Sequence, residues 1–147
     1  GRKLAQNGGR AVQRLFALID SECAEETTDQ TVKLVSERLA KAAGEMKAAT
    51  MWFVKNAMAN PNNLGAGAYP YMTLTGIVSL GLMWLRMATA AQAALDAGTE
   101  DSAFMNAKVI TARFYAERSL PETISLRRKL EAGAESVMAL PVEAFAA

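Results

Sequence analysis

Two groups of carboxylates come closest, by residue type and spacing, to general acid–base chemistry. Glu22, Glu25 and Glu26 cluster where a helix is expected to end, and Glu100 and Asp101 stand where another is expected to begin. A carboxylate that works as an acid or base near neutral pH needs burial or a like charge that raises its pKa. No apolar flank suggests a raised pKa for either group, so both are interpreted as solvated surface with a capping role.

Cys23 and Glu117 are further candidates, one as a nucleophile and the other as a base. A reactive cysteine needs a histidine or a helix N-terminus that lowers the pKa of its thiol, and neither is expected near Cys23. We therefore interpret Cys23 as a small buried apolar residue. Glu117 lies between Arg113 and Arg118 and is predicted to be ion-paired at the surface.

The absence of histidine excludes imidazole bases, Ser-His-Asp and Cys-His catalysis, and zinc sites built on histidine. The single cysteine excludes CxxC motifs and an intrachain disulfide, and it is typical of a protein in a reducing compartment. The sequence also contains neither a GxGxxG string nor a P-loop. We predict no catalytic, cofactor-binding or metal-binding residue in this chain.

Composition predicts one helical domain without a nucleic-acid surface. The 147 residues include 29 alanines, and alanine has the highest helix propensity. The 16 basic and 15 acidic residues leave a net charge of +1, without the basic bias of nucleic-acid-binding proteins.

Apolar residues at spacings of three and four predict a first helix at residues 9–24 and a second that follows capping residues 27–29 and ends at the turn 60–63. Arg10, Arg14 and Glu22 are expected in solvent. The predicted apolar faces are Val12, Leu15, Phe16, Ile19 and Cys23, then Val32, Val35, Leu39, Ala42, Met46, Ala49, Phe53 and Ala57.

The third predicted helix contains residues 69–85, none of which is charged. A membrane span is one interpretation, but the run is shorter than the ~20 residues that a bilayer needs. We favour a fully buried central helix. Pro70, one turn into it, predicts a kink or a ragged start. Gly76 and Gly81 predict close approach of a neighbouring backbone.

A fourth helix is predicted from about Glu100, with Glu100 and Asp101 in its first turn. Pro121 should kink or restart it, with Ser119 and Glu122 at capping-box spacing. Apolar residues continue through Ile124, Leu126 and Leu130 to about residue 131. Its two apolar faces are Ala103, Ala107, Ile110 and Phe114, then Val109, Ala112, Ala116 and Leu120.

The predicted fold is all-α, an up-down-up-down bundle of four main helices with the third helix at its centre. Residues 1–135 form the predicted bundle domain, and residues 136–147 form a C-terminal tail.

Four blocks of sequence, in order, resemble the C-terminal helical domain of the acyl-CoA dehydrogenases, in particular the 3-methylmercaptopropionyl-CoA dehydrogenase-like family. They are residues 1–4 (GRKL), 67–71 (GAYPY) with Leu74 and Gly76, 107–118 (AKVITARFYAER) with Leu120 and Pro121, and 132–138 (AGAESVM).

The resemblance implies that this chain is part of a longer flavoenzyme whose catalytic glutamate and flavin-contacting residues precede Gly1. In that family FAD accepts a hydride from the acyl-CoA β-carbon while a glutamate removes the α-proton, and an electron-transfer flavoprotein takes the electrons. The resemblance also implies a cytoplasmic homo-oligomer, with this domain packed on the catalytic body or on its dimer mate. No family motif for catalysis or FAD falls on these residues, so the chain alone is expected to be noncatalytic and to bind no FAD.

Two alternatives remain at this point, a free-standing helical interaction module and a membrane-associated protein built on residues 69–85. The docking interpretation also predicts an exposed apolar patch. Its candidates are Met51, Trp52, Val54 and Met58, with Met83, Trp84 and Met87. Completion of the core is the alternative for both groups.

Overall fold

The computed structural model describes residues 4, 6–57 and 59–146. Two short 3₁₀ helices, η1 (Gln6–Gly9) and η2 (Val142–Phe145), flank five α-helices. The α-helices are α2 (Arg10–Cys23), α3 (Gln30–Asn56), α4 (Asn62–Asp96), α5 (Ser102–Arg118) and α6 (Glu122–Glu131). No strand is formed by the residues that the structure describes, which confirms the predicted all-α class.

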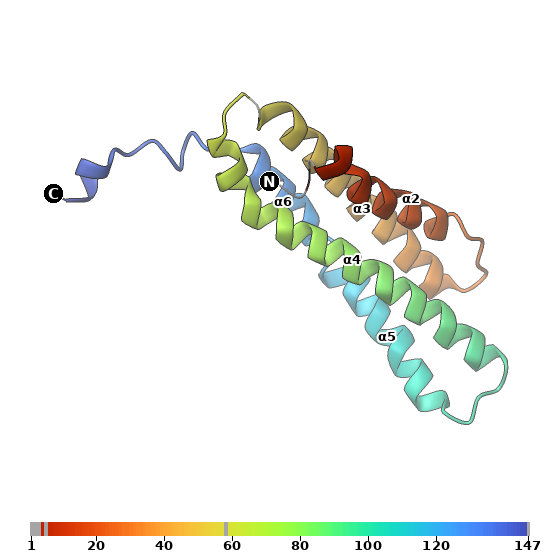
Figure 1. The fold of residues 1–147 in the computed structure, drawn as a ribbon. Helices are drawn as coiled ribbons and strands as arrows, with labels where there is room; N and C mark the ends of the chain where they lie inside the picture. Colours follow the sequence, from red (N-terminus) through yellow and green to blue (C-terminus); the bar gives the residue numbers. More distant parts are fainter. Residues whose placement is uncertain (1–3, 5, 58, 147) are drawn as a thin grey trace.

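Successive helices run up and down in an elongated bundle, as Figure 1 shows. Helix α4 packs against α3, α5 and α6, whereas α2 lies on α3 at the edge. Helices α5 and α6 follow one another along α4 and act as one broken fourth helix, which agrees with the predicted bundle. Residues 135–146 are exposed and run away from the bundle, while the predicted domain boundary at residue 135 stays a prediction.

Helix α3 confirms the predicted cap and apolar stripe. Asp29 adopts an extended conformation, and its side chain accepts a hydrogen bond of 2.8 Å from the backbone N–H of Val32. This contact satisfies one of the free N–H groups at the helix start. The stripe is buried from Val32 through Phe53, with Ala57 half-buried in the turn beyond.

Helix α4 begins earlier than predicted, because two of the asparagines expected in the turn are its first residues. Asn62 donates its backbone N–H to the side-chain oxygen of Asn60 at 3.0 Å, so Asn60 satisfies the first N–H of the helix from the preceding turn, while the N-cap residue is Pro61. Pro70 is therefore two turns inside the helix, not one, and the expected ragged start there is wrong. Pro70 costs only one backbone hydrogen bond, and its ring is buried against the core.

Helix α4 is central but not fully buried, which corrects the prediction. Leu74, Val78, Leu82 and Leu85 lie in the core, whereas the opposite side of the helix is exposed. By length and composition alone, α4 is the one helix in the described part of the chain that could cross a membrane. Its contacts with three other helices favour the interpretation as a core helix.

Two glycines let α4 approach its neighbours closely. A Cβ on Gly81 would lie 2.9 Å from Leu120 and 3.0 Å from Leu39. The predicted close approach at Gly81 is therefore confirmed, although side chains and not a backbone make the contact. Gly76 has no neighbour within 4 Å of a Cβ position, so the prediction for it is wrong. Gly67, which the prediction missed, packs against the Phe53 ring.

Helix α5 departs from the prediction in its start and in one face. It begins at Ser102, so Glu100 and Asp101 precede the first turn, and Asp101 makes no side-chain cap bond. Ala112, Ala116 and Leu120 are buried as predicted. The other predicted face is exposed along its whole length, because α3 and α4 cover α5 from one side only. That face consists of Ala103, Ala107, Ile110 and Phe114.

Pro121 restarts the helix as α6, as predicted, but without the capping box. Glu122 donates its backbone N–H to the carbonyl of Ser119 at 3.1 Å, and no side chain caps α6. The hydroxyl of Thr123 instead donates to the carbonyl of Leu120 at 2.7 Å, inside the core. Leu126 and Leu130 are buried, whereas Ile124 is exposed.

Asn63 joins three parts of the chain at one end of the bundle. Its side-chain amide donates to the carbonyl of Asn56 at the end of α3, at 3.2 Å. Its side-chain oxygen accepts from the backbone N–H of Ala134, beyond α6, at 3.0 Å. Gly133 has a φ of +68°, which turns the chain towards this contact and favours glycine.

We expect Gly67→Ala to destabilise the fold. A Cβ there would lie 2.6 Å from the Phe53 ring and 3.3 Å from Leu130. Overpacking costs about 1–3 kcal/mol and the gain in helix propensity offsets about 1 kcal/mol, so the free energy of unfolding should fall by roughly 0–2 kcal/mol in urea unfolding. Gly44→Ala is the control, because nothing lies within 4 Å of its Cβ position, and it should stabilise. Equal effects of the two substitutions would contradict the packing argument.

Asn63→Ala should lower the free energy of unfolding by about 1–3 kcal/mol, because it leaves the backbone N–H of Ala134 without its partner. The carbonyl of Asn56 keeps its hydrogen bond from the backbone N–H of Asn60. Asn62→Ala is the matched control, since Asn62 is exposed and only its backbone is hydrogen-bonded. Thermal melts that fail to separate the two variants would refute the role of Asn63.

Candidate functional site

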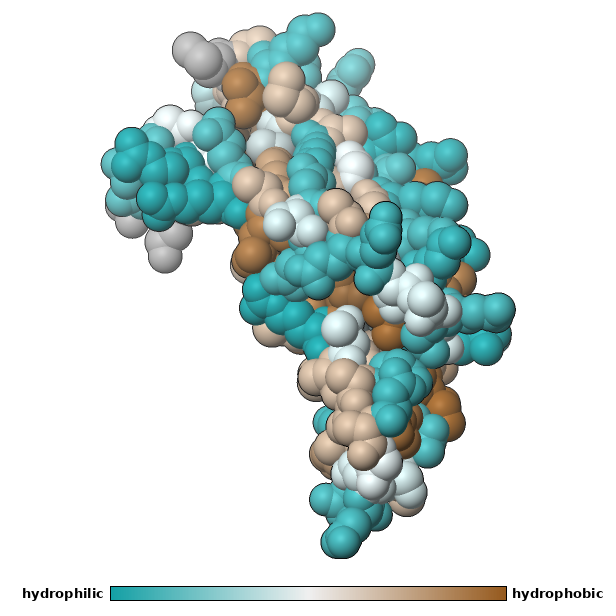
Figure 2. All heavy atoms as spheres, turned by 90° about the vertical axis from the view of Figure 1, so that its right-hand side faces the viewer, coloured by the Kyte–Doolittle hydropathy of each residue, from teal (hydrophilic) through white to brown (hydrophobic). Residues whose placement is uncertain are grey.

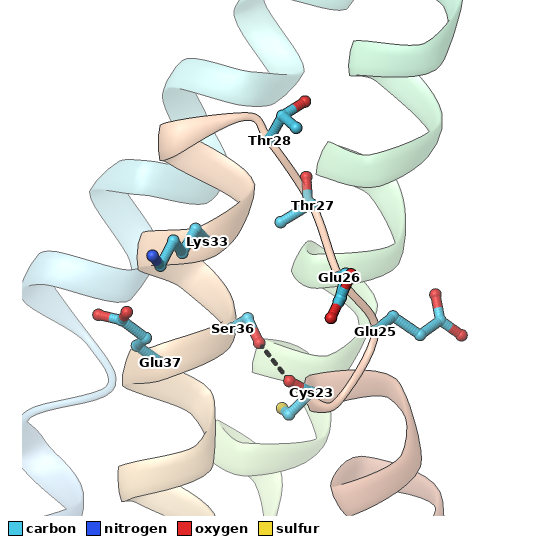
Figure 3. A pocket seen from close by; sticks show the side chains of 8 residues that line it. All are labelled: Cys23, Glu25, Glu26, Thr27, Thr28, Lys33, Ser36 and Glu37. Atoms are coloured by element: carbon cyan, nitrogen blue, oxygen red, sulfur yellow. Dashed lines mark hydrogen bonds between the residues drawn. The ribbon is translucent and has the colours of Figure 1, made fainter.

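A depression of about 790 Å³ lies beside the loop that joins α2 to α3. Figure 3 shows its lining side chains spread along this loop and the start of α3. Three carboxylates, those of Glu25, Glu26 and Glu37, are exposed there beside the single cation of Lys33. The glutamates are solvated, as predicted, and nothing in their surroundings prepares one of them as an acid or base.

Cys23 borders the same depression but is half-buried. Burial raises the pKa of its thiol above the ordinary value of 9.0, and the charges of Asp20 and Glu22 raise it further. The hydrogen bond with Ser36 and the charge of Lys47 act in the opposite direction with less effect. A raised pKa leaves little thiolate, which favours the packing interpretation over a reactive thiol, although Cys23 is half-buried and not buried as predicted.

Glu22 differs from its predicted role as a solvated residue. It forms a bidentate ion pair with Arg86 of α4, with 2.9 Å from Nε of Arg86 to each carboxylate oxygen. Its side chain is only 18% exposed. This ion pair connects the peripheral α2 to the central helix α4. The two residues are 64 positions apart, so no local sequence pattern could predict it.

Other charged groups are also paired. Glu117 accepts from Nε of Arg113 at 3.0 Å on the surface of α5, as predicted. Glu45 of α3 faces Arg127 of α6 at 2.5 Å, at an angle outside that of a hydrogen bond, so the contact is an ion pair. No three histidine, cysteine, aspartate or glutamate residues of the described chain are grouped to hold a metal.

Exposed apolar surface is the more distinctive feature of this chain. Helix α4 exposes Tyr69, Met72, Leu80 and Met83, and α5 exposes Phe104, Ile110 and Phe114. Between the two helices the rings of Trp84 and Tyr115 are 6.3 Å apart, and the hydroxyl of Tyr115 donates to the carbonyl of Ile77 at 2.9 Å. Lys108 lies 5.8 Å from the Trp84 ring and 5.0 Å from the Phe104 ring.

The predicted docking groups separate into core and surface residues. Trp52 and Trp84 are half-buried against the core. Each is therefore partly a core residue and partly a surface residue. Met51, Val54 and Met83 are exposed, as docking requires. Met87 is half-buried, and Met58 lies outside the described residues.

The apolar surface does not cover the whole molecule. Figure 2 shows the side at the right of Figure 1 as largely hydrophilic, with hydrophobic side chains in the furrows between helices. The loop between α2 and α3 lies on this side, and its glutamates are exposed. The surfaces of α4 and α5 are therefore the candidate functional site, as an interface rather than an active site.

We expect the thiol of Cys23 to react several-fold more slowly with a thiol reagent than an exposed cysteine in the same chain. The comparison is Ala93→Cys in a Cys23→Ser background, since Ala93 is exposed on α4. Because burial raises the pKa of Cys23, its rate should continue to increase to a higher pH than the rate of the exposed cysteine does. A rate that exceeds that of the exposed cysteine near neutral pH would contradict this assignment.

Comparison with known proteins gives the context of this surface. Residues 15–141 match the family described as "Acetyl-CoA dehydrogenase C-terminal like". The chain is 32% identical over 123 residues to "3-methylmercaptopropionyl-CoA dehydrogenase" of Ruegeria pomeroyi, covering 83% of this chain and 21% of the relative. It is 28% identical over 152 residues to "Broad-specificity linear acyl-CoA dehydrogenase FadE5" of Mycobacterium tuberculosis, covering 98% of this chain and 25% of the relative.

The chain thus spans about a fifth to a quarter of the length of these two curated relatives. The match extends from within α2 through the end of α6 and into the tail, so it includes the whole packed core of α3 to α6. These findings confirm the resemblance inferred from the four sequence blocks. The chain belongs to the acetyl-CoA dehydrogenase C-terminal-like family, the C-terminal helical domain of acyl-CoA dehydrogenases.

Proposed function

We propose that this chain is the accessory C-terminal domain of an FAD-dependent acyl-CoA dehydrogenase and has a structural, noncatalytic role. The parent enzyme would introduce an α,β double bond into an acyl-CoA thioester. The observation that carries the proposal is the family match over residues 15–141, in a chain whose carboxylates are solvated or ion-paired. Both named relatives are acyl-CoA dehydrogenases.

The depression beside the α2–α3 loop does not suit FAD. The depression beside the α2–α3 loop exposes three glutamates, which would repel the pyrophosphate of the cofactor. A flavin also needs an enclosed apolar slot for its ring system, and this depression is an open, partly polar surface. The proposal therefore assigns FAD and the catalytic base to the remainder of the parent enzyme.

The exposed face of α5 supports a role in docking on the catalytic body. Ile110 and Phe114 are 68% and 60% exposed, and Phe104, nearer the start of the helix, is 59% exposed. Such side chains in solvent weaken a free-standing module and are stabilised when a partner covers them. The proposal further assigns the parent to the cytoplasm, as a homo-oligomer that passes electrons to an electron-transfer flavoprotein.

The proposal predicts different behaviour of the domain and of its parent. The 147-residue chain should purify colourless and should oxidise no acyl-CoA, because it supplies no base and no flavin site. The protein encoded by the complete reading frame should purify yellow, and a suitable acyl-CoA should bleach its flavin absorbance.

Two outcomes would overturn the proposal. Stoichiometric flavin bound to the 147-residue chain would place part of the cofactor site in this domain. A complete protein without flavin, or with flavin that no acyl-CoA reduces, would favour a helical interaction module instead.

The docking role of α5 predicts that Ile110→Glu with Phe114→Glu, made in the complete protein, weakens the contact of this domain with the catalytic body and speeds its proteolysis. Ala93→Glu is the control, because Ala93 is exposed on α4.

A further inference from the structure

Helix α2 is attached to the bundle more weakly than the other α-helices. It lies at the edge and packs mainly on α3, whereas α3, α4, α5 and α6 share one core (Figure 1). Only one of its 14 residues, Ile19, is fully buried, while Val12, Leu15 and Phe16 are half-buried against the core. The core of α3 to α6 therefore depends little on α2.

Two ion pairs at the last turn of α2 supply much of its attachment. Asp20 pairs with Lys47 of α3 at 2.6 Å, and Glu22 forms the bidentate pair with Arg86 of α4. We call these four residues the α2 latch. The side chains of Lys47 and Arg86 are 39% and 47% exposed, so both pairs are in contact with water. Ion pairs in this setting are weakened by salt.

The charges of α2 oppose its own helix dipole. Arg10 lies in the first turn, at the positive end of the dipole, and Asp20 and Glu22 lie in the last turn, at the negative end. The N-cap residue, Gly9, makes no side-chain hydrogen bond to the helix. A helix of 14 residues with such ends is unstable in water by itself. Helix α2 is therefore helical because the bundle holds it and neutralises its two acids.

We propose that α2 is a releasable helix, which leaves the bundle and melts as one unit while α3 to α6 stay folded. Proteins open in such local units at a lower free energy than that of global unfolding. The α2 latch sets the balance between the attached and the released state. Because salt screens exposed ion pairs, a higher ionic strength shifts this balance towards release.

The consequence for the parent enzyme rests on the proposed function, which makes this chain a C-terminal domain and places α2 at its connection with the catalytic body. The family match begins at residue 15, within α2. As a helix the 14 residues span about 21 Å, whereas the extended chain spans up to roughly 46 Å. Release of α2 lengthens this connection and lets the domain change its orientation on the catalytic body.

Hydrogen exchange of the 147-residue chain, followed by mass spectrometry, tests the release. At low ionic strength the amides of residues 15–23 should exchange ~10-fold or more faster than those of residues 39–53 in α3, because a local opening exposes them. In about 1 M NaCl, where the Debye length is ~3 Å, the rate for α2 should increase further by several-fold. The rate for α3 should not increase.

Lys47→Gln with Arg86→Gln tests the latch, because it removes both cations and leaves the sequence of α2 unchanged. Exchange of residues 15–23 at low salt should become about 5-fold faster and should respond less to added NaCl. Lys41→Gln with Lys55→Gln is the matched control, with the same loss of charge from exposed residues of α3. Neither Lys41 nor Lys55 is ion-paired within the described part of the chain.

Ala17→Pro tests whether the bundle survives without α2. Ala17 is exposed in the middle of α2, and proline there prevents the helix without entering the core. Circular dichroism should lose only the signal of the 14 residues of α2, and the other helices should still melt in one cooperative step. Loss of the whole helical signal would overturn the proposal.

Three other results would also overturn it. They are equal exchange rates for α2 and α3, a rate for α2 that salt leaves unchanged, and equal effects of the two double glutamine variants. These measurements involve neither flavin nor acyl-CoA, so their failure is distinguishable from a failure of the proposed function.

Discussion

The packing of α4 against α3 and the α5–α6 line is the constraint on which the rest of the structure depends. Gly67 and Gly81 let the ring of Phe53 and the side chains of Leu39 and Leu120 approach the backbone of α4. Larger residues there would separate the helices and open voids in the core, and each void would cost packing energy. Helix α2 contributes one fully buried residue, Ile19, and the Glu22–Arg86 ion pair.

The same helix gives the molecule two different surfaces. One side of α4 is the core, while its opposite side and the outer face of α5 expose large apolar side chains. Residues 69–85 of α4 carry no charge, whereas Lys108 and Arg113 lie among the exposed apolar residues of α5. The hydrophilic side around the α2–α3 loop suits solvent, and the apolar side suits contacts with protein. A domain without acid, base or metal groups in position can still serve an enzyme by supplying such contacts.

The sequence by itself determined the helical class, the helix order and most core positions. The spacing of Val32 through Phe53 required one buried face, Asp29 had to cap α3, and Pro121 had to interrupt the last helix. The absence of histidine and the single cysteine exclude imidazole bases, histidine zinc sites and CxxC motifs. These features are local, since each depends on residues within a few turns of one another.

The tertiary structure alone decided which apolar faces are covered. Periodicity marked both faces of α5 as apolar, but only contacts with α3 and α4 bury Ala112 and Ala116 and leave Ile110 and Phe114 exposed. The roles of Gly67, Gly81 and Asn63 depend on partners far away in the sequence, and so does the pairing of Glu22 with Arg86. Such contacts join distant segments, and no local pattern encodes which segments meet.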